Sequence, residues 1–117
     1  MSTTIATTTE AVLNQHVQAL ISRDPDRIAS DYADDAVLFT PGGVFKGTEG
    51  VRQFVDVALQ ILSPESLANL KVIKQTIEGE YAYVLWSAGE AIPFAGDTFL
   101  IRDGKIVMQS AVFQPNS

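Results

Sequence analysis

The end of the chain carries the feature that most restricts its fold, the stretch FLIRDGKIVMQSAVF at residues 99–113. Two apolar runs flank Asp103-Gly104, and an Asp-Gly pair between such runs is typical of a tight β-hairpin. Residues 70–78 alternate apolar and polar side chains, Gly79 interrupts them, and residues 81–90 continue as another strand. A loop containing Pro93 separates these strands from the hairpin. The second half of the chain therefore predicts a meander of antiparallel strands.

The first half of the chain begins with the spacing of helices. Thr7 and Glu10 fit a capping box for a first helix over residues 7–24. An apolar stripe at helical spacing marks its buried face: Val12, Leu13, Val17, Leu20 and Ile21. Asp24-Pro25 then predicts the start of a second, short helix with Ile28, Ala29 and Tyr32 on one face.

A strand, a turn and a third helix follow. Residues 36–40 predict a strand, residues 41–43 a turn and residues 44–45 a short return strand. Asp34-Asp35, after the second helix, is expected to be a solvated turn. Thr48 is expected to cap the third helix, and Ser63-Pro64 to end it.

Helices followed by strands predict an α+β domain with three N-terminal helices packed on one face of a curved, mixed or antiparallel sheet. Residues 1–117 are expected to form this single domain, with residues 1–6 as a flexible N-terminus. A curved sheet over helices encloses a cone, a cone-shaped α+β barrel, whose open end is a natural ligand site. The helices leave the outer sheet face uncovered, which predicts a homodimer formed through that face. Its expected apolar residues are Ile73, Tyr83, Leu85, Val107 and Val112.

Composition excludes several classes of function. The net charge of −6 and the lack of a Lys or Arg run argue against binding nucleic acid. The chain has no Cys and one His, so we expect no disulfide, no metal site and no cofactor. No apolar stretch is long enough for a membrane span, and the first residues lack the features of a signal peptide, which predicts a cytoplasmic protein.

With no familiar catalytic motif, candidate functional residues are those expected to face the cone. His16 lies in the apolar stripe of the first helix and is either a satisfied core-edge histidine or a group that titrates near neutral pH. Asp97 is either a solvated loop acid or a pocket carboxyl, because its phase with Phe99 points it inward. The expected ligand contacts, several of which serve equally as core packing, are Tyr32, Thr40, Phe54, Trp86, Phe99, Gln109 and Phe113.

Two stretches, IASDYADDAVLFTPGGVFKGTEGVRQFV (residues 28–55) and GDTFLIRDGKI (residues 96–106), resemble the nuclear transport factor 2-like superfamily. The resemblance is to the ketosteroid-isomerase-like and SnoaL-like, or polyketide-cyclase-like, branch of that superfamily. The resemblance places Thr40 where the isomerases carry their general-base Asp, and a hydroxyl cannot serve as that base. It places His16 at the site of an oxyanion-binding Tyr and retains Asp97, the second oxyanion donor. Steroid isomerisation by the family mechanism is therefore not expected.

The same resemblance predicts that His16 and Asp97 are neighbours. We expect Asp97 to accept a hydrogen bond from one ring nitrogen of His16, which leaves the other nitrogen for proton transfer in the cavity. One hypothesis is then an isomerase-, cyclase- or dehydratase-type enzyme acting on a small apolar carbonyl compound. The other is a non-catalytic dimeric domain that binds a ligand or a protein partner. An open cavity that holds His16 and Asp97 within hydrogen-bond reach favours the first hypothesis, and a filled cavity would exclude it.

Overall fold

The computed structural model describes residues 2–114, with side chains from Thr8 to Phe113. The elements, in chain order, are α1 (Ser2–Ser22), α2 (Pro25–Ala29), β1 (Tyr32–Thr40), β2 (Gly43–Lys46), α3 (Gly47–Ile61), α4 (Pro64–Ala68), β3 (Leu70–Glu78), β4 (Tyr81–Ala88), β5 (Ile92–Arg102) and β6 (Lys105–Gln114). The strands form one six-stranded sheet in the order β2-β1-β6-β5-β4-β3. The predicted α+β class with helices on a curved mixed sheet is confirmed.

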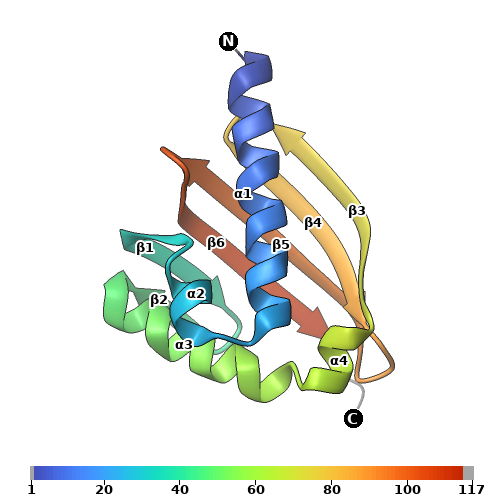
Figure 1. Ribbon diagram of the computed structural model, residues 1–117. Helices are drawn as coiled ribbons and strands as arrows, with labels where there is room; N and C mark the ends of the chain where they lie inside the picture. Colours follow the sequence, from blue (N-terminus) through green and yellow to red (C-terminus); the bar gives the residue numbers. More distant parts are fainter. Residues whose placement is uncertain (1, 115–117) are drawn as a thin grey trace.

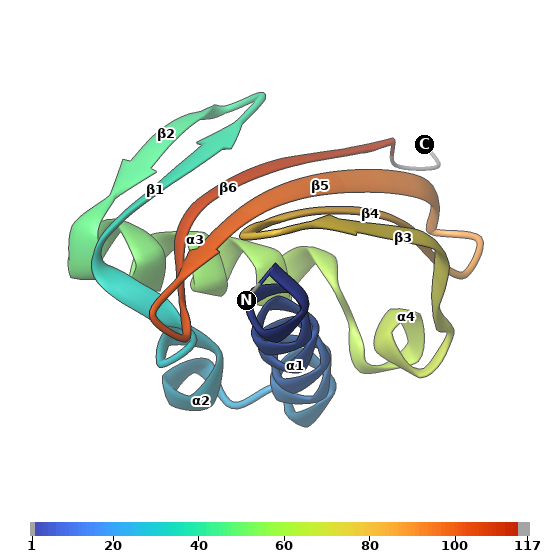
Figure 2. The same cartoon turned by 90° about the horizontal axis from the view of Figure 1, so that it is seen from above.

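The sheet arches over the helices, which all lie on its concave face (Figures 1 and 2). Strands β3, β4, β5 and β6 pair antiparallel in chain order, which confirms the predicted meander of the second half. β1 pairs antiparallel with β2 but parallel with β6, so the sheet as a whole is mixed. Alternation along β5 turns Ala95, Asp97, Phe99 and Ile101 into the interior. Phe99 and Ile101 pack with α1, β1 and α3 in the main hydrophobic core, and Ala95 belongs to a second core cluster. Asp97 lies between them on the same buried face of β5.

Two of the predicted local signals work as expected. Asp24 caps α2, because its side chain accepts hydrogen bonds from the backbone N–H groups of Asp26 and Arg27. Asp103 and Gly104, with φ of 54° and 76°, form the two-residue turn of the β5–β6 hairpin. Positive φ at both positions suits the right-handed twist of the strands that the turn joins.

Several boundaries differ from the prediction. The first helix begins at Ser2, so Thr7 and Glu10 lie inside it, and Thr48 lies inside α3, whose N-cap is Lys46 with no side-chain cap. α3 ends at Ile61, just before Ser63-Pro64, as predicted. Ser63-Pro64 also starts α4, a fourth helix that the sequence does not predict, in which the Ser63 hydroxyl accepts from the Ser66 backbone N–H.

The start of β1 and the end of β4 also differ. Tyr32 opens β1 rather than closing a helix, and Asp34 and Asp35 are solvated, as expected, but within the strand instead of a turn. Pro93 lies inside β5 rather than in a loop. β1 and β5 are therefore longer than predicted.

The outer face of the sheet is exposed. Ile73, Tyr83 and Val112 are exposed on it, whereas Leu85 and Val107 are half-buried. Tyr81, at the start of β4, is a further exposed aromatic side chain. Among the helices that the structure describes, none combines the length and the apolar character needed to cross a bilayer.

Candidate functional site

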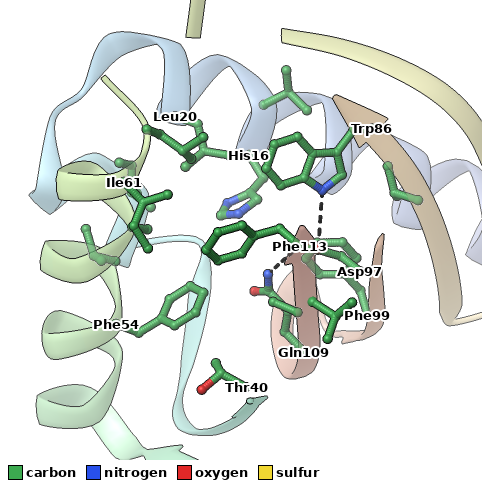
Figure 3. A pocket seen from close by; sticks show the side chains of 18 of the residues that line it. His16, Leu20, Thr40, Phe54, Ile61, Trp86, Asp97, Phe99, Gln109 and Phe113 are labelled. Carbon is green, nitrogen blue, oxygen red and sulfur yellow. Dashed lines mark hydrogen bonds between the residues drawn. The ribbon is translucent and has the colours of Figure 1, made fainter. Parts of the chain in front are cut away.

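A cavity of about 450 Å³ lies between the concave face of the sheet and helices α1, α3 and α4 (Figure 3). Its size falls within the range of small-molecule sites. Most of its walls are apolar side chains such as Leu20, Phe54, Ile61 and Ile92. The residues predicted from sequence to face the cone all line it: His16, Tyr32, Thr40, Phe54, Trp86, Asp97, Phe99, Gln109 and Phe113. The cone is therefore open, although no catalytic or binding role follows from lining it alone.

His16 projects from α1 into this cavity and is held by Asp31. Its Nδ1 lies 2.9 Å from Oδ2 of Asp31, and Gln15 donates from Nε2 to the other carboxylate oxygen at 2.7 Å. Both groups are buried, with exposed fractions of 4% for His16 and 1% for Asp31. Burial alone would raise the pKa of Asp31, but the hydrogen bonds from His16 and Gln15, together with the electrostatic attraction of His16 and Lys105, outweigh burial, and the net pKa is lowered. Asp31 is therefore an ionised acceptor for the Nδ1–H of His16.

The second ring nitrogen of His16 faces the cavity. Among the described residues, every fully buried side-chain nitrogen or oxygen has a hydrogen-bond partner. Nε2 of His16 has no hydrogen-bond partner among these residues, so this atom is not fully buried. Nε2 is therefore open to the cavity. Tyr32 and Phe99 pack edge-on against the ring, with centroids 5.5 and 6.0 Å away, and hold its orientation. With Nδ1 donating to Asp31, the neutral ring presents Nε2 to the cavity as a proton acceptor.

Asp97 forms a separate network on the sheet. Its Oδ1 accepts from Trp86 Nε1 at 3.2 Å and its Oδ2 accepts from Gln109 Nε2 at 2.9 Å. Tyr32 donates its hydroxyl to Oε1 of Gln109, which leaves the Gln109 amide oriented toward Asp97. The register explains this grouping, since Asp97 pairs with Val84 and Ala111, and Trp86 and Gln109 are diagonal neighbours on the same face.

Burial raises the pKa of Asp97 to about 6, and the hydrogen bonds from Trp86 and Gln109, together with the nearby His16, limit the rise. Burial, with the nearby charges of Asp97 and Asp31, also raises the pKa of Tyr32, which stays neutral. The carboxyl of Asp97 therefore changes charge near neutral pH inside an apolar cavity. Groups with such perturbed pKa values are common at functional sites.

The predicted hydrogen bond between His16 and Asp97 is wrong. Asp31 takes the Nδ1 position of His16, and both oxygens of Asp97 are occupied by Trp86 and Gln109. The turn after α2 explains why His16 is hydrogen-bonded to Asp31 and not to Asp97. Asp31 donates its backbone N–H to Ile28 and accepts from the backbone N–H of Ile106, which fixes its side chain under α1. His16 and Asp97 remain close enough to interact electrostatically.

Asp31 was not predicted from the sequence. It is one of three acidic residues within the segment IASDYADD, and nothing in the local pattern separates it from the solvated Asp34 and Asp35. The only usable signal is its position directly before Tyr32, at the junction between a short helix and a strand. Which acid contacts His16 depends on how α1 crosses that junction, a tertiary feature.

Thr40 lies at the opposite end of the cavity, beside Pro41 and Gly42. Its hydroxyl donates to the backbone oxygen of Gly43 at 2.9 Å, which ties the end of β1 to β2. A neutral hydroxyl engaged in this way supplies no base. No group of three or more metal-binding side chains occurs among the described residues.

Comparison with known proteins agrees with this architecture. The model of the SnoaL-like domain family matches residues 13–109, and the chain belongs to this family, in the SnoaL-like branch of the nuclear transport factor 2-like superfamily. A search of curated proteins finds no match.

Solved structures share the fold at low identity. An NTF-2 like protein of unknown function from Burkholderia xenovorans LB400 is 22% identical, with a TM-score of 0.74 over 94% of this chain and 85% of that one. A SnoaL-like protein of unknown function from Burkholderia thailandensis E264 is 18% identical, with a TM-score of 0.75 over 92% and 95% of the two chains. The epoxide hydrolase/cyclase-like enzyme SalBIII of pyran ring formation in salinomycin is 13% identical, with a TM-score of 0.70 over 91% and 90%. These likenesses establish the fold alone.

Proposed function

We propose that the cavity catalyses proton transfer on a small, mostly apolar carbonyl compound, in an isomerisation, cyclisation or dehydration. The observation that carries this proposal is the buried pair of His16 and Asp31, which leaves Nε2 of His16 as an unpartnered base in an apolar cavity. The cyclase-like neighbour supports the reaction class only by sharing the fold.

In the proposed reaction, Nε2 of His16 removes a proton from the carbon beside the substrate carbonyl. The C–H bond breaks, its electron pair moves onto the carbonyl oxygen as an enolate, and the new N–H bond makes the ring an imidazolium. Asp31, hydrogen-bonded at Nδ1, and the charge of Asp97 both stabilise that cation. The imidazolium then returns the proton to another atom of the substrate, or to a leaving hydroxyl in a dehydration. Thr40 takes no part.

The test uses 2-tetralone, a compact enolisable ketone, in D2O with NMR detection of deuterium entering the carbon beside the carbonyl. We expect exchange faster than with equimolar imidazole, a loss of about a hundredfold or more in His16→Gln, and a loss of about tenfold to a hundredfold in Asp31→Asn. Thr40→Ala serves as the control. Exchange that persists in His16→Gln would contradict the proposal.

The second candidate is a non-catalytic ligand-binding or protein-interaction domain of the same fold. It is favoured by Thr40, because the position of the isomerase base holds no carboxyl. The same experiment separates the two, since 2-tetralone that binds without exchange above the imidazole level would favour a binding domain.

We further propose that the protein acts as a homodimer joined through the outer sheet face. Ile73, Tyr83 and Val112 are exposed on this face, which the helices leave uncovered (Figure 2). A sedimentation experiment is expected to show a dimer at micromolar concentration that Tyr83→Glu weakens. A monomeric wild type would exclude this arrangement. The absence of nucleic-acid or membrane partners and a cytoplasmic location stay predictions from the sequence.

A further inference from the structure

The carboxyl of Asp97 lies among aromatic rings, which affects the class of ligand that the cavity can bind. On the same sheet face, Phe99 follows it by two residues on β5, while Trp86 on β4 and Phe113 on β6 are its diagonal neighbours. Figure 3 shows these rings around the cavity, with the Trp86 indole bonded to the carboxyl. The face of an aromatic ring attracts a cation, most strongly when water is excluded.

The protonation state of Asp97 follows from its partners. The Trp86 indole nitrogen can only donate a hydrogen bond. Gln109 donates from Nε2 to Asp97, while its Oε1 accepts from the Tyr32 hydroxyl. Both oxygens of Asp97 therefore act as acceptors, which is the arrangement of a carboxylate rather than of a neutral acid that donates to a ligand. Neither donor carries a charge, so the carboxylate lacks a neutralising cation in direct contact.

With Asp97 ionised, the charge of the cavity is negative for either state of His16. The buried groups that can carry charge there are Asp31, Asp97 and His16, so that two carboxylates face at most one imidazolium, while Tyr32 stays neutral. No Lys or Arg is among the described residues that line the cavity. Lys105 acts on Asp31 from outside, where its Nζ donates to the backbone oxygen of Ser30. A buried carboxylate without a counter-ion is costly, and a ligand that brings a cation removes that cost.

We propose that the cavity selects a ligand with a protonated amine, whose ammonium group pairs with Asp97 against the rings of Trp86, Phe99 and Phe113. The apolar remainder of the ligand packs against α1 and α3, and anionic compounds are excluded. This inference rests on the proposed function in using the same cavity, and it narrows the substrate to carbonyl compounds that also carry a basic nitrogen. Asp97 then binds the substrate, while His16 moves the proton.

The test compares three ligands with the same hydrocarbon cage, 1-adamantylamine, 1-adamantanol and 1-adamantanecarboxylate, by titration calorimetry at pH 7.5. We expect the amine to bind at least about tenfold more tightly than the alcohol, and the carboxylate to bind more weakly than either. Asp97→Asn is expected to abolish the preference for the amine. Asp35→Asn, which removes an exposed carboxylate from β1, is expected to leave it unchanged.

Equal binding of amine and alcohol, an amine preference that survives Asp97→Asn, or no binding of any of the three would overturn the inference. His16→Gln separates this inference from the proposed catalysis. It is expected to abolish exchange on 2-tetralone yet retain an amine preference that depends on Asp97. Loss of exchange with no amine preference in the wild type would leave the catalytic proposal standing and refute the ligand class.

Discussion

Replacing Asp97 with Asn is expected to stabilise the protein at pH 8 and to change its stability much less at pH 4. The reason is the buried position of the carboxyl, which has an exposed fraction of 9%. Burial raises its pKa in the folded protein to about 6, against 3.8 for the ordinary side chain. Below pH 3.8 the carboxyl is protonated in both the folded and the unfolded chain and does not affect their balance. Between the two pKa values only the folded chain retains the proton, so folding becomes less favourable as the pH rises.

The destabilisation reaches its full size well above pH 6, where the carboxyl has lost its proton in the folded chain as well. A gap of about two between the pKa values corresponds to a cost of about 3 kcal/mol in the free energy of unfolding. Asparagine stays neutral and escapes this cost. It also rearranges the hydrogen bonds with Trp86 and Gln109, at a cost of about 1 kcal/mol that is nearly independent of pH. At pH 4, just above the ordinary pKa of 3.8, about 0.5 kcal/mol of the cost is already present, so the gain from Asp97→Asn should be about 2.5 kcal/mol larger at pH 8 than at pH 4.

Urea denaturation of the wild type and Asp97→Asn at both pH values measures this difference directly. Comparing the two proteins at each pH cancels the titration of the groups that do not interact with Asp97. Asp35→Asn, which removes an exposed carboxyl, is the control and should show no comparable gain. A gain that is equal at pH 4 and pH 8 would refute the reasoning, because Asp97 would then titrate alike in the folded and unfolded chain.

Three further substitutions test local parts of the structure. Thr40→Ala should leave proton exchange unchanged, and a collapse of exchange would show that the chemistry lies at that end of the cavity. Asp24→Ala removes the cap of α2 and should cost about 1 kcal/mol in the free energy of unfolding, measured with urea, whereas no loss would contradict the cap. Gly79→Ala places a side chain at φ 61° between β3 and β4 and should cost about 1 kcal/mol, and a neutral result would show that the turn relaxes.

Local patterns in the sequence determine much of this fold. The Asp103-Gly104 hairpin and the Asp24 cap follow from residues that lie within a few positions of each other. Ser63-Pro64 follows the end of α3, as predicted, but it also starts α4, because a serine followed by proline fits the start of a helix as well as the end of one. The parallel pairing of β1 with β6 joins strands that are far apart in the chain, and no local pattern specifies it.

Local patterns in the sequence likewise predict only a part of the candidate site. Alternation along β5 and β6 predicts that Asp97 and Gln109 face inward, and the stripe on α1 predicts the same for His16. Which of these polar groups touch one another depends on distances across the core. His16 therefore has Asp31 as its partner, while Asp97 has Trp86 and Gln109. Sequence periodicity predicts which face of each element is buried, but it does not predict the contacts between elements.

The position of the proton on His16 tests the central claim most directly. His16 is the only histidine in the chain, so nitrogen-15 NMR of the labelled protein reports one imidazole. At a pH where the ring is neutral, the account predicts a proton on Nδ1, donated to Asp31, and a bare Nε2 that faces the cavity. A ring that carries its proton on Nε2 would have no free base in the cavity and would contradict the proposed role of His16.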